Sequence, residues 1–118
     1  MPQKKDSEIG KEGDRQSRPS HFSRDEAKRK IRQILREGDT ILSDHLLKDI
    51  QTGWHGVSQQ DVLYVLQSGE IISPPEWDDA HRNWKYKVEG TDLEAEEELR
   101  AITIIIEERF SIFIVMAY

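Results

Sequence analysis

Two lysines on one face of a predicted strand are the residues best placed to do chemistry. In the stretch NWKYKVEG, residues 83–90, Lys85 and Lys87 alternate with apolar residues, so the lysines face one side of the strand and the apolar residues the other. A pair of positive charges can hold a phosphodiester and stabilise the charge that develops on it, while a histidine or tyrosine moves a proton. Alternatively, the lysines are ordinary edge-strand charges that discourage aggregation.

Other side chains that can complete such a site are scattered along the chain. His45 and Lys48 are three residues apart and can share one face of a helix. His45 can instead be a hydrogen-bonding residue at the start of that helix. The remaining members of the set are His81, Arg82, Arg109 and Tyr118.

Other kinds of site are not indicated by the sequence. The chain has no cysteine, which excludes a thiolate zinc site and a cysteine nucleophile. No two histidines have the i, i+4 spacing that places two metal ligands on one helical face, and no glycine-rich phosphate loop occurs. The stretch DLEAEEE alternates carboxylates as a calcium loop does, but it lacks the glycine that such a loop needs. We therefore expect neither a metal nor a cofactor.

The charge of the chain is unevenly divided. Residues 1–36 contain 11 Lys and Arg and 6 Asp and Glu, a net charge of +5, whereas residues 37–118 contain 6 and 17, a net charge of −11. An acidic body repels a polyanion, which counts against nucleic-acid binding unless its few cations gather on one face. The longest apolar run is far shorter than the roughly 18 residues of a membrane span, and the N-terminus lacks the apolar centre of a signal peptide. We expect no membrane association and a cytoplasmic location.

The N-terminal part predicts a tail and a basic helix. Residues 1–20 are polar and almost free of large apolar side chains, which is typical of a disordered tail. A helix over residues 23–37 follows, with Ser23 as its N-cap and Glu26 completing a capping box. Arg29 and Arg32 on this helix are candidate contacts to RNA or to a partner, and the alternative is a solvated surface helix.

Residues 39–118 predict the core of a single α+β domain that spans residues 21–118. DTILSD predicts a short strand, and HLLKDIQ and SQQDVLYVLQSG predict two helices that pack as a hairpin, the second capped by Ser58 and Asp61. The stretch SPPEWDDAHR is predicted as a loop. NWKYKVEG, LRAITIIIEE and FSIFIVMAY are predicted strands, and the last two are apolar on both faces, as central strands are. We expect antiparallel strands with the helices on one face.

Several of these motifs resemble a known family. SDHLLKDIQTGWHGVSQQDVLYVLQSGEII, NWKYKVEGTD and IFIVMAY follow one another between residues 41 and 118. This order resembles a bacterial domain family of unknown function that is grouped with the RelE/ParE toxin superfamily. The resemblance implies a RelE-like antiparallel sheet of about four strands with helices packed on one face, preceded here by the basic helix. It also implies a toxin of a type II toxin-antitoxin system that cleaves messenger RNA without a metal, either on the ribosome or as free RNA, with a cognate antitoxin as its partner.

Two hypotheses of function follow, and each predicts a different arrangement of side chains. In the first, the chain is an RNA endonuclease whose catalytic residues His45, Arg82 and Lys85 converge in one cleft. Arg109 and Tyr118 are its secondary candidates, and Lys48 and Lys87 are its RNA contacts. In the second, the chain is a non-catalytic protein of the same fold that binds a partner through Trp54, Trp77 and the basic helix, and its cations are scattered.

Overall fold

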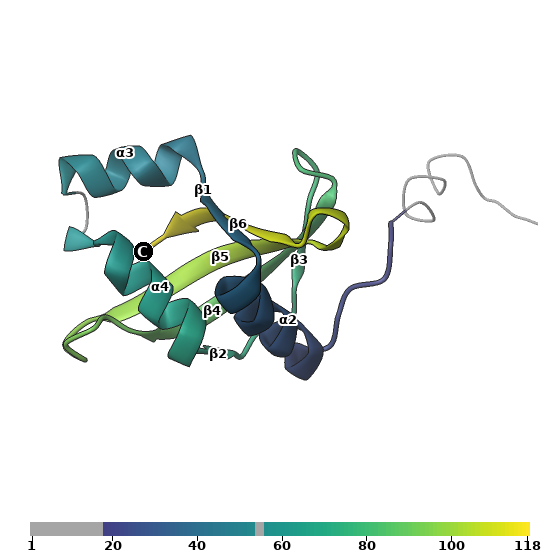
Figure 1. Ribbon diagram of the computed structural model, residues 1–118, viewed down its shortest axis with the longest axis horizontal. Coiled ribbons are helices and arrows are strands. Elements are labelled where there is room, and N and C mark those ends of the chain that lie inside the picture. The colour runs from purple at the N-terminus through teal and green to yellow at the C-terminus, as the bar shows by residue number, and fades with distance from the viewer. Residues whose placement is uncertain (1–17, 54–55) are drawn as a thin grey trace, which may run out of the picture.

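The structure is a computed structural model that describes residues 18–53 and 56–118, and it shows an α+β fold as predicted (Figure 1). Its helices are α2 (Arg24–Glu37), α3 (Asp44–Thr52) and α4 (Gln59–Ser68), with a short 3₁₀ helix η2 (Glu107–Arg109). Its strands are β1 (Asp39–Leu42), β2 (Glu70–Ile71), β3 (Glu76–Asp78), β4 (Asn83–Thr91), β5 (Glu98–Ile106) and β6 (Ser111–Ala117).

The six strands form one mixed sheet, which is larger than the antiparallel sheet of about four strands that we expected. The strand order is β1-β6-β5-β4-β2, and β3 also pairs with β4. β1 runs parallel to β6, and the other pairs are antiparallel. β3 lies within the stretch predicted as a loop, because three residues beside two prolines are too short to show a period of two.

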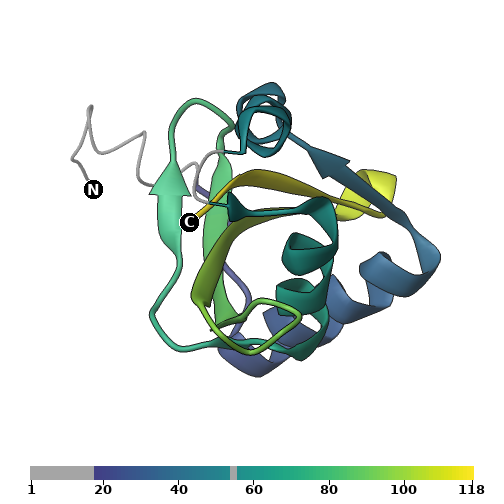
Figure 2. The same cartoon turned by 90° about the vertical axis from the view of Figure 1, so that its left-hand side faces the viewer.

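The helices α2 and α4 pack on one face of the curved sheet, as predicted (Figure 2). The predicted hairpin of α3 and α4 is wrong in its packing: α4 contacts α2, β4 and β5, whereas α3 packs against β6. The cause is the N-terminal helix, since α2 takes the place beside α4 that we assigned to α3.

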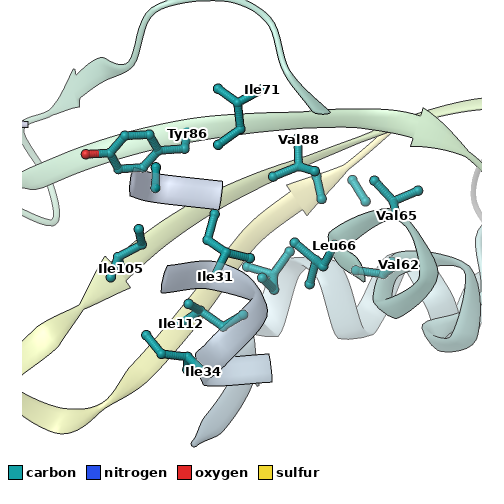
Figure 3. Close-up of a cluster of buried hydrophobic side chains, with 14 of the residues drawn as sticks. Ile31, Ile34, Val62, Val65, Leu66, Ile71, Tyr86, Val88, Ile105 and Ile112 are labelled. Carbon is teal, nitrogen blue, oxygen red and sulfur yellow. The ribbon is translucent and has the colours of Figure 1, made fainter. Parts of the chain in front are cut away.

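Side chains from both layers meet in the core between the helices and the sheet (Figure 3). Ile31 from α2 and Val65 from α4 are at most 1% exposed. Tyr86 and Val88 of β4 are buried on this side, as the alternation in NWKYKVEG predicted. It follows that Lys85 and Lys87, which alternate with these two residues along β4, lie on the opposite face of the sheet.

The segment that precedes α2 is held against β4. Ser23 caps α2 as predicted, its Oγ accepting a hydrogen bond from the Glu26 N–H at 3.2 Å. The capping box predicted with Glu26 is not formed among the described residues, because the Glu26 carboxylate makes no return bond to the Ser23 N–H. Trp84 Nε1 donates to the Pro19 carbonyl and the Phe22 N–H donates to the Tyr86 hydroxyl, both at 2.8 Å. Residues 18–20 therefore belong to the folded part, contrary to the predicted tail of residues 1–20. Residues 1–17 of that tail lie outside the described residues.

The cap predicted for α4 at Ser58 and Asp61 is present and forms a complete capping box. Ser58 Oγ accepts from the Asp61 N–H at 3.1 Å, and Asp61 Oδ2 accepts from the Ser58 N–H at 3.1 Å. The other carboxylate oxygen of Asp61 accepts from the Leu93 N–H at 3.1 Å. Asp61 thus ties the start of α4 to the loop between β4 and β5.

We expect Asp61 to make the fold sensitive to acid. Burial raises the pKa of this carboxyl, but the hydrogen bonds from Leu93 and Ser58 outweigh burial, so the pKa lies below its ordinary value of 3.8. Because the pKa is lower in the folded than in the unfolded state, Asp61 stabilises the fold above its unfolded pKa and loses this effect as the pH falls through its folded pKa. Urea unfolding between about pH 6 and pH 3 should show a loss of stability on acidification that is smaller in Asp61→Asn. Glu94→Gln, exposed in the same loop, is the control, and an unchanged profile in Asp61→Asn would contradict the prediction.

Candidate functional site

Two hollows lie on the sheet face opposite α2 and α4. The first, which we call the lysine hollow, has a volume of about 240 Å³. It is lined by Lys85 and Lys87 from β4, by Tyr118, and by Glu76 from β3, with Ile102 and Met116 among its apolar residues. The cross-strand register explains this grouping, since Lys87 pairs with Ile102 and Ile102 with Met116. Lys85, Lys87 and Tyr118, which were all predicted for the site, therefore line the same hollow.

The second hollow, which we call the histidine hollow, adjoins Lys85 through its cross-strand neighbour Ile104. It has a volume of about 330 Å³ and is lined by His81, Asn83, Ile104, Arg109 and Phe113, among others. Ile104 is the register partner of Lys85. The His81 ring lies 5.3 Å from that of Phe113, measured between centroids. Arg109, a secondary candidate, is thus placed beside a histidine.

Asp78 connects the two hollows. Its Oδ2 lies 3.1 Å from His81 Nδ1 and 4.0 Å from Lys85 Nζ. The Asp78 side chain is only 12% exposed. Burial raises the pKa of Asp78, but its hydrogen bonds with the His81 side chain and backbone and the charges of His81 and Lys85 outweigh burial, and the net pKa is below the ordinary value. Asp78 is therefore a carboxylate near neutral pH, able to orient the His81 ring.

The predicted convergence of His45, Arg82 and Lys85 is absent from the structure. His45 is on α3, where its Nε2 lies 3.3 Å from Asp49 Oδ2 and its side chain is 68% exposed. Lys48 is exposed on the same helix. α3 follows β1, and β6 and β5 separate β1 from the strand of Lys85. Sequence spacing could not reveal this separation, because it depends on the strand order.

Arg82 also lies apart from Lys85. Its guanidinium stacks over the Trp77 ring at 5.7 Å from the centroid. Trp77 pairs with Trp84, and Trp84 is on the same face of β4 as Tyr86. Arg82 therefore reaches the helix side of the sheet, opposite to Lys85.

The residues predicted as partner contacts differ in how far they are already engaged within the protein. Trp77 is covered by two arginines, with the Arg18 guanidinium 5.0 Å from its ring, and its Nε1 donates to Asp79 at 2.8 Å. Arg29 is exposed on α2, whereas Arg32 donates to the Gly69 carbonyl at 3.1 Å. Trp54 lies outside the described residues.

The site residue that the predicted catalytic set missed is His81. The signal was in the sequence, because Asp78 precedes it by three residues and an aspartate at this spacing can accept from the ring across a turn. Within residues 18–53 and 56–118, no three His, Asp or Glu side chains are grouped as metal ligands would be. The helices of this same part are too short or too polar to cross a membrane.

Comparison of the chain with protein-family models, with curated proteins and with solved structures finds no match. The geometry of the site is therefore the basis for the function proposed below.

Proposed function

We propose that the chain is a metal-independent RNA endonuclease whose site is the sheet face formed by the lysine and histidine hollows. The observation that carries this proposal is the position of Lys85. It lies 4.0 Å from the carboxylate that holds His81, and it lines the same hollow as Lys87 and Tyr118. One face of the sheet thus presents a proton acceptor, His81, two cations, Lys85 and Lys87, and the phenol of Tyr118.

These groups suit the cleavage of RNA through its own 2′-hydroxyl. Asp78 accepts from Nδ1–H of His81, which leaves Nε2 to take the proton of the 2′-hydroxyl. The 2′-oxygen attacks the adjacent phosphorus, the bond from phosphorus to the 5′-oxygen breaks, and Lys85 and Lys87 stabilise the charge on the phosphate. Tyr118 donates a proton to the leaving 5′-oxygen. The products are a 2′,3′-cyclic phosphate and a 5′-hydroxyl, and DNA is no substrate because it lacks the 2′-hydroxyl.

The charge of the chain favours RNA that is presented by another particle. Residues 37–118 carry a net charge of −11, and Glu76 and Asp78 lie among the cations of the site. Long-range attraction of free RNA is therefore weak. We propose that the substrate is messenger RNA held on the ribosome, and that the chain acts as a toxin controlled by a cognate antitoxin, as its resemblance to the RelE/ParE superfamily implies.

The test is growth and messenger-RNA integrity after induction of the untagged chain in a bacterial host, followed by cleavage assays on translating ribosomes. We expect growth arrest and discrete cuts with 5′-hydroxyl ends. His81→Ala and Lys85→Ala should each slow cleavage by about a hundredfold, because each removes one proton-transfer or charge-stabilising group.

His45→Ala and Lys48→Ala are the matched controls, since they remove an exposed histidine and an exposed lysine from α3 and should leave cleavage unchanged. Normal growth and intact RNA with folded wild-type protein would overturn the nuclease proposal. That result would favour the alternative, a non-catalytic protein that binds a partner.

A further inference from the structure

Another concave surface lies on the helix side of the sheet, opposite to the lysine and histidine hollows. It is a groove of about 540 Å³ between α2, α4 and β1, which we call the β1 groove. Its apolar wall consists of Leu35, Leu42 and Leu63, all partly buried against the core. Arg32 and Arg36 also line it, one helical turn apart on α2.

The strand beside this groove has an unpaired edge. β1 is the last strand of the sheet order, with β6 as its single strand neighbour among the described residues. The Asp39 N–H donates to the carbonyl of Phe110, just before β6, at 3.2 Å, and the Ser43 N–H donates to the carbonyl of Ile114 within β6 at 3.0 Å. The N–H and C=O groups of successive residues in a strand point in opposite directions, so those of Thr40 and Leu42 point away from β6. The side chains of these same two residues line the groove.

The arginines of the groove indicate the charge of its occupant. Arg32 is held at the groove wall by its hydrogen bond to the Gly69 carbonyl at 3.1 Å. Arg36 is exposed at the rim. Two guanidinium groups beside three leucines are complementary to a carboxylate flanked by aliphatic groups.

We propose that the β1 groove binds an extended, acidic segment of a partner protein, which adds to the sheet as a strand beside β1. Backbone hydrogen bonds to Thr40 and Leu42 align the segment, and alternate side chains point into the groove. An aliphatic side chain packs on Leu35 and Leu63, and a glutamate or aspartate meets Arg32 and Arg36. The groove and the lysine hollow are on opposite faces, so this binding does not depend on the proposed nuclease activity.

The probe is a dye-labelled peptide in which threonines separate a leucine, a glutamate and a second leucine. In a strand, the two leucines and the glutamate then share one face. The matched peptide has lysine in place of glutamate. Fluorescence anisotropy with the full chain is expected to show that the glutamate peptide binds more tightly by at least about tenfold. Equal binding of the two peptides, or no binding of the glutamate peptide, would overturn the proposal.

Two variants test the charge and the strand edge separately. Arg36→Glu should weaken binding of the glutamate peptide by about tenfold or more, whereas Arg29→Glu, exposed on the same helix but outside the groove, should change it by less than about twofold. Thr40→Pro removes an outward N–H that does not face β6, and it should weaken binding with the fold retained in circular dichroism. Unchanged binding in Arg36→Glu would overturn the proposal. A dimer seen by sedimentation and abolished by Thr40→Pro would also overturn it, because a second copy would then occupy the groove.

Discussion

Gly38→Ala is expected to destabilise the protein by about 3 kcal/mol or more. Gly38 ends α2 and leads directly into β1, where it lies against the turn that precedes β6. A Cβ at this position would overlap the carbonyl oxygen of Phe110 and lie 2.8 Å from the Cδ2 atom of the same residue. The overlapped atom is backbone, and the same oxygen accepts from the Asp39 N–H, so it cannot move without breaking the join between β1 and β6. Urea unfolding followed by circular dichroism measures the loss.

Gly53→Ala is the matched control for this substitution. Gly53 has a φ of 74°, and no described residue lies within 4 Å of an added Cβ, so alanine there meets backbone strain without a clash with residues 18–53 or 56–118. We expect a cost of about 1 kcal/mol from the left-handed conformation. Equal costs at Gly38 and Gly53 would contradict the steric explanation.

Ile112→Ala is expected to destabilise the protein by about 4 kcal/mol. Ile112 is fully buried in β6, with Thr40 of β1 on one side and Ile105 of β5 on the other. Removal of three carbons leaves a cavity where helices and sheet meet, and the paired strands on both sides limit how far the site can collapse. Because a domain of this size has a total stability of about 5–15 kcal/mol, the variant should be largely unfolded at modest urea concentrations.

Two substitutions calibrate this effect. Ile112→Val removes one methyl group and should cost about 1 kcal/mol. Ile41→Ala is on the neighbouring strand, but its side chain is 45% exposed, so it should cost about 0.5 kcal/mol or less. A cost of Ile41→Ala close to that of Ile112→Ala would show that β1 is buried by something other than this chain.

Local signals in the sequence were sufficient for the elements with caps or a clear period. Ser23 and Ser58 begin helices as predicted, because a cap is a hydrogen bond between residues that are three apart in the chain. Lys85 and Lys87 face away from the core as predicted, because side chains alternate along any strand. The same alternation correctly predicted that Tyr86 and Val88 are buried in the core.

The partners of each site residue were decided by long-range pairing. The sequence by itself determined that the chain is α+β, that two lysines share an open strand face, and that a basic helix precedes the sheet. Only the tertiary structure decided that His81, and not His45, lies near Lys85, because this depends on the β3–β4 pairing and on β5 and β6 separating β1 from β4. Only the tertiary structure also decided that α2 lies beside α4 and forms the β1 groove, since the apolar face of a helix shows that it must be covered but not by which element.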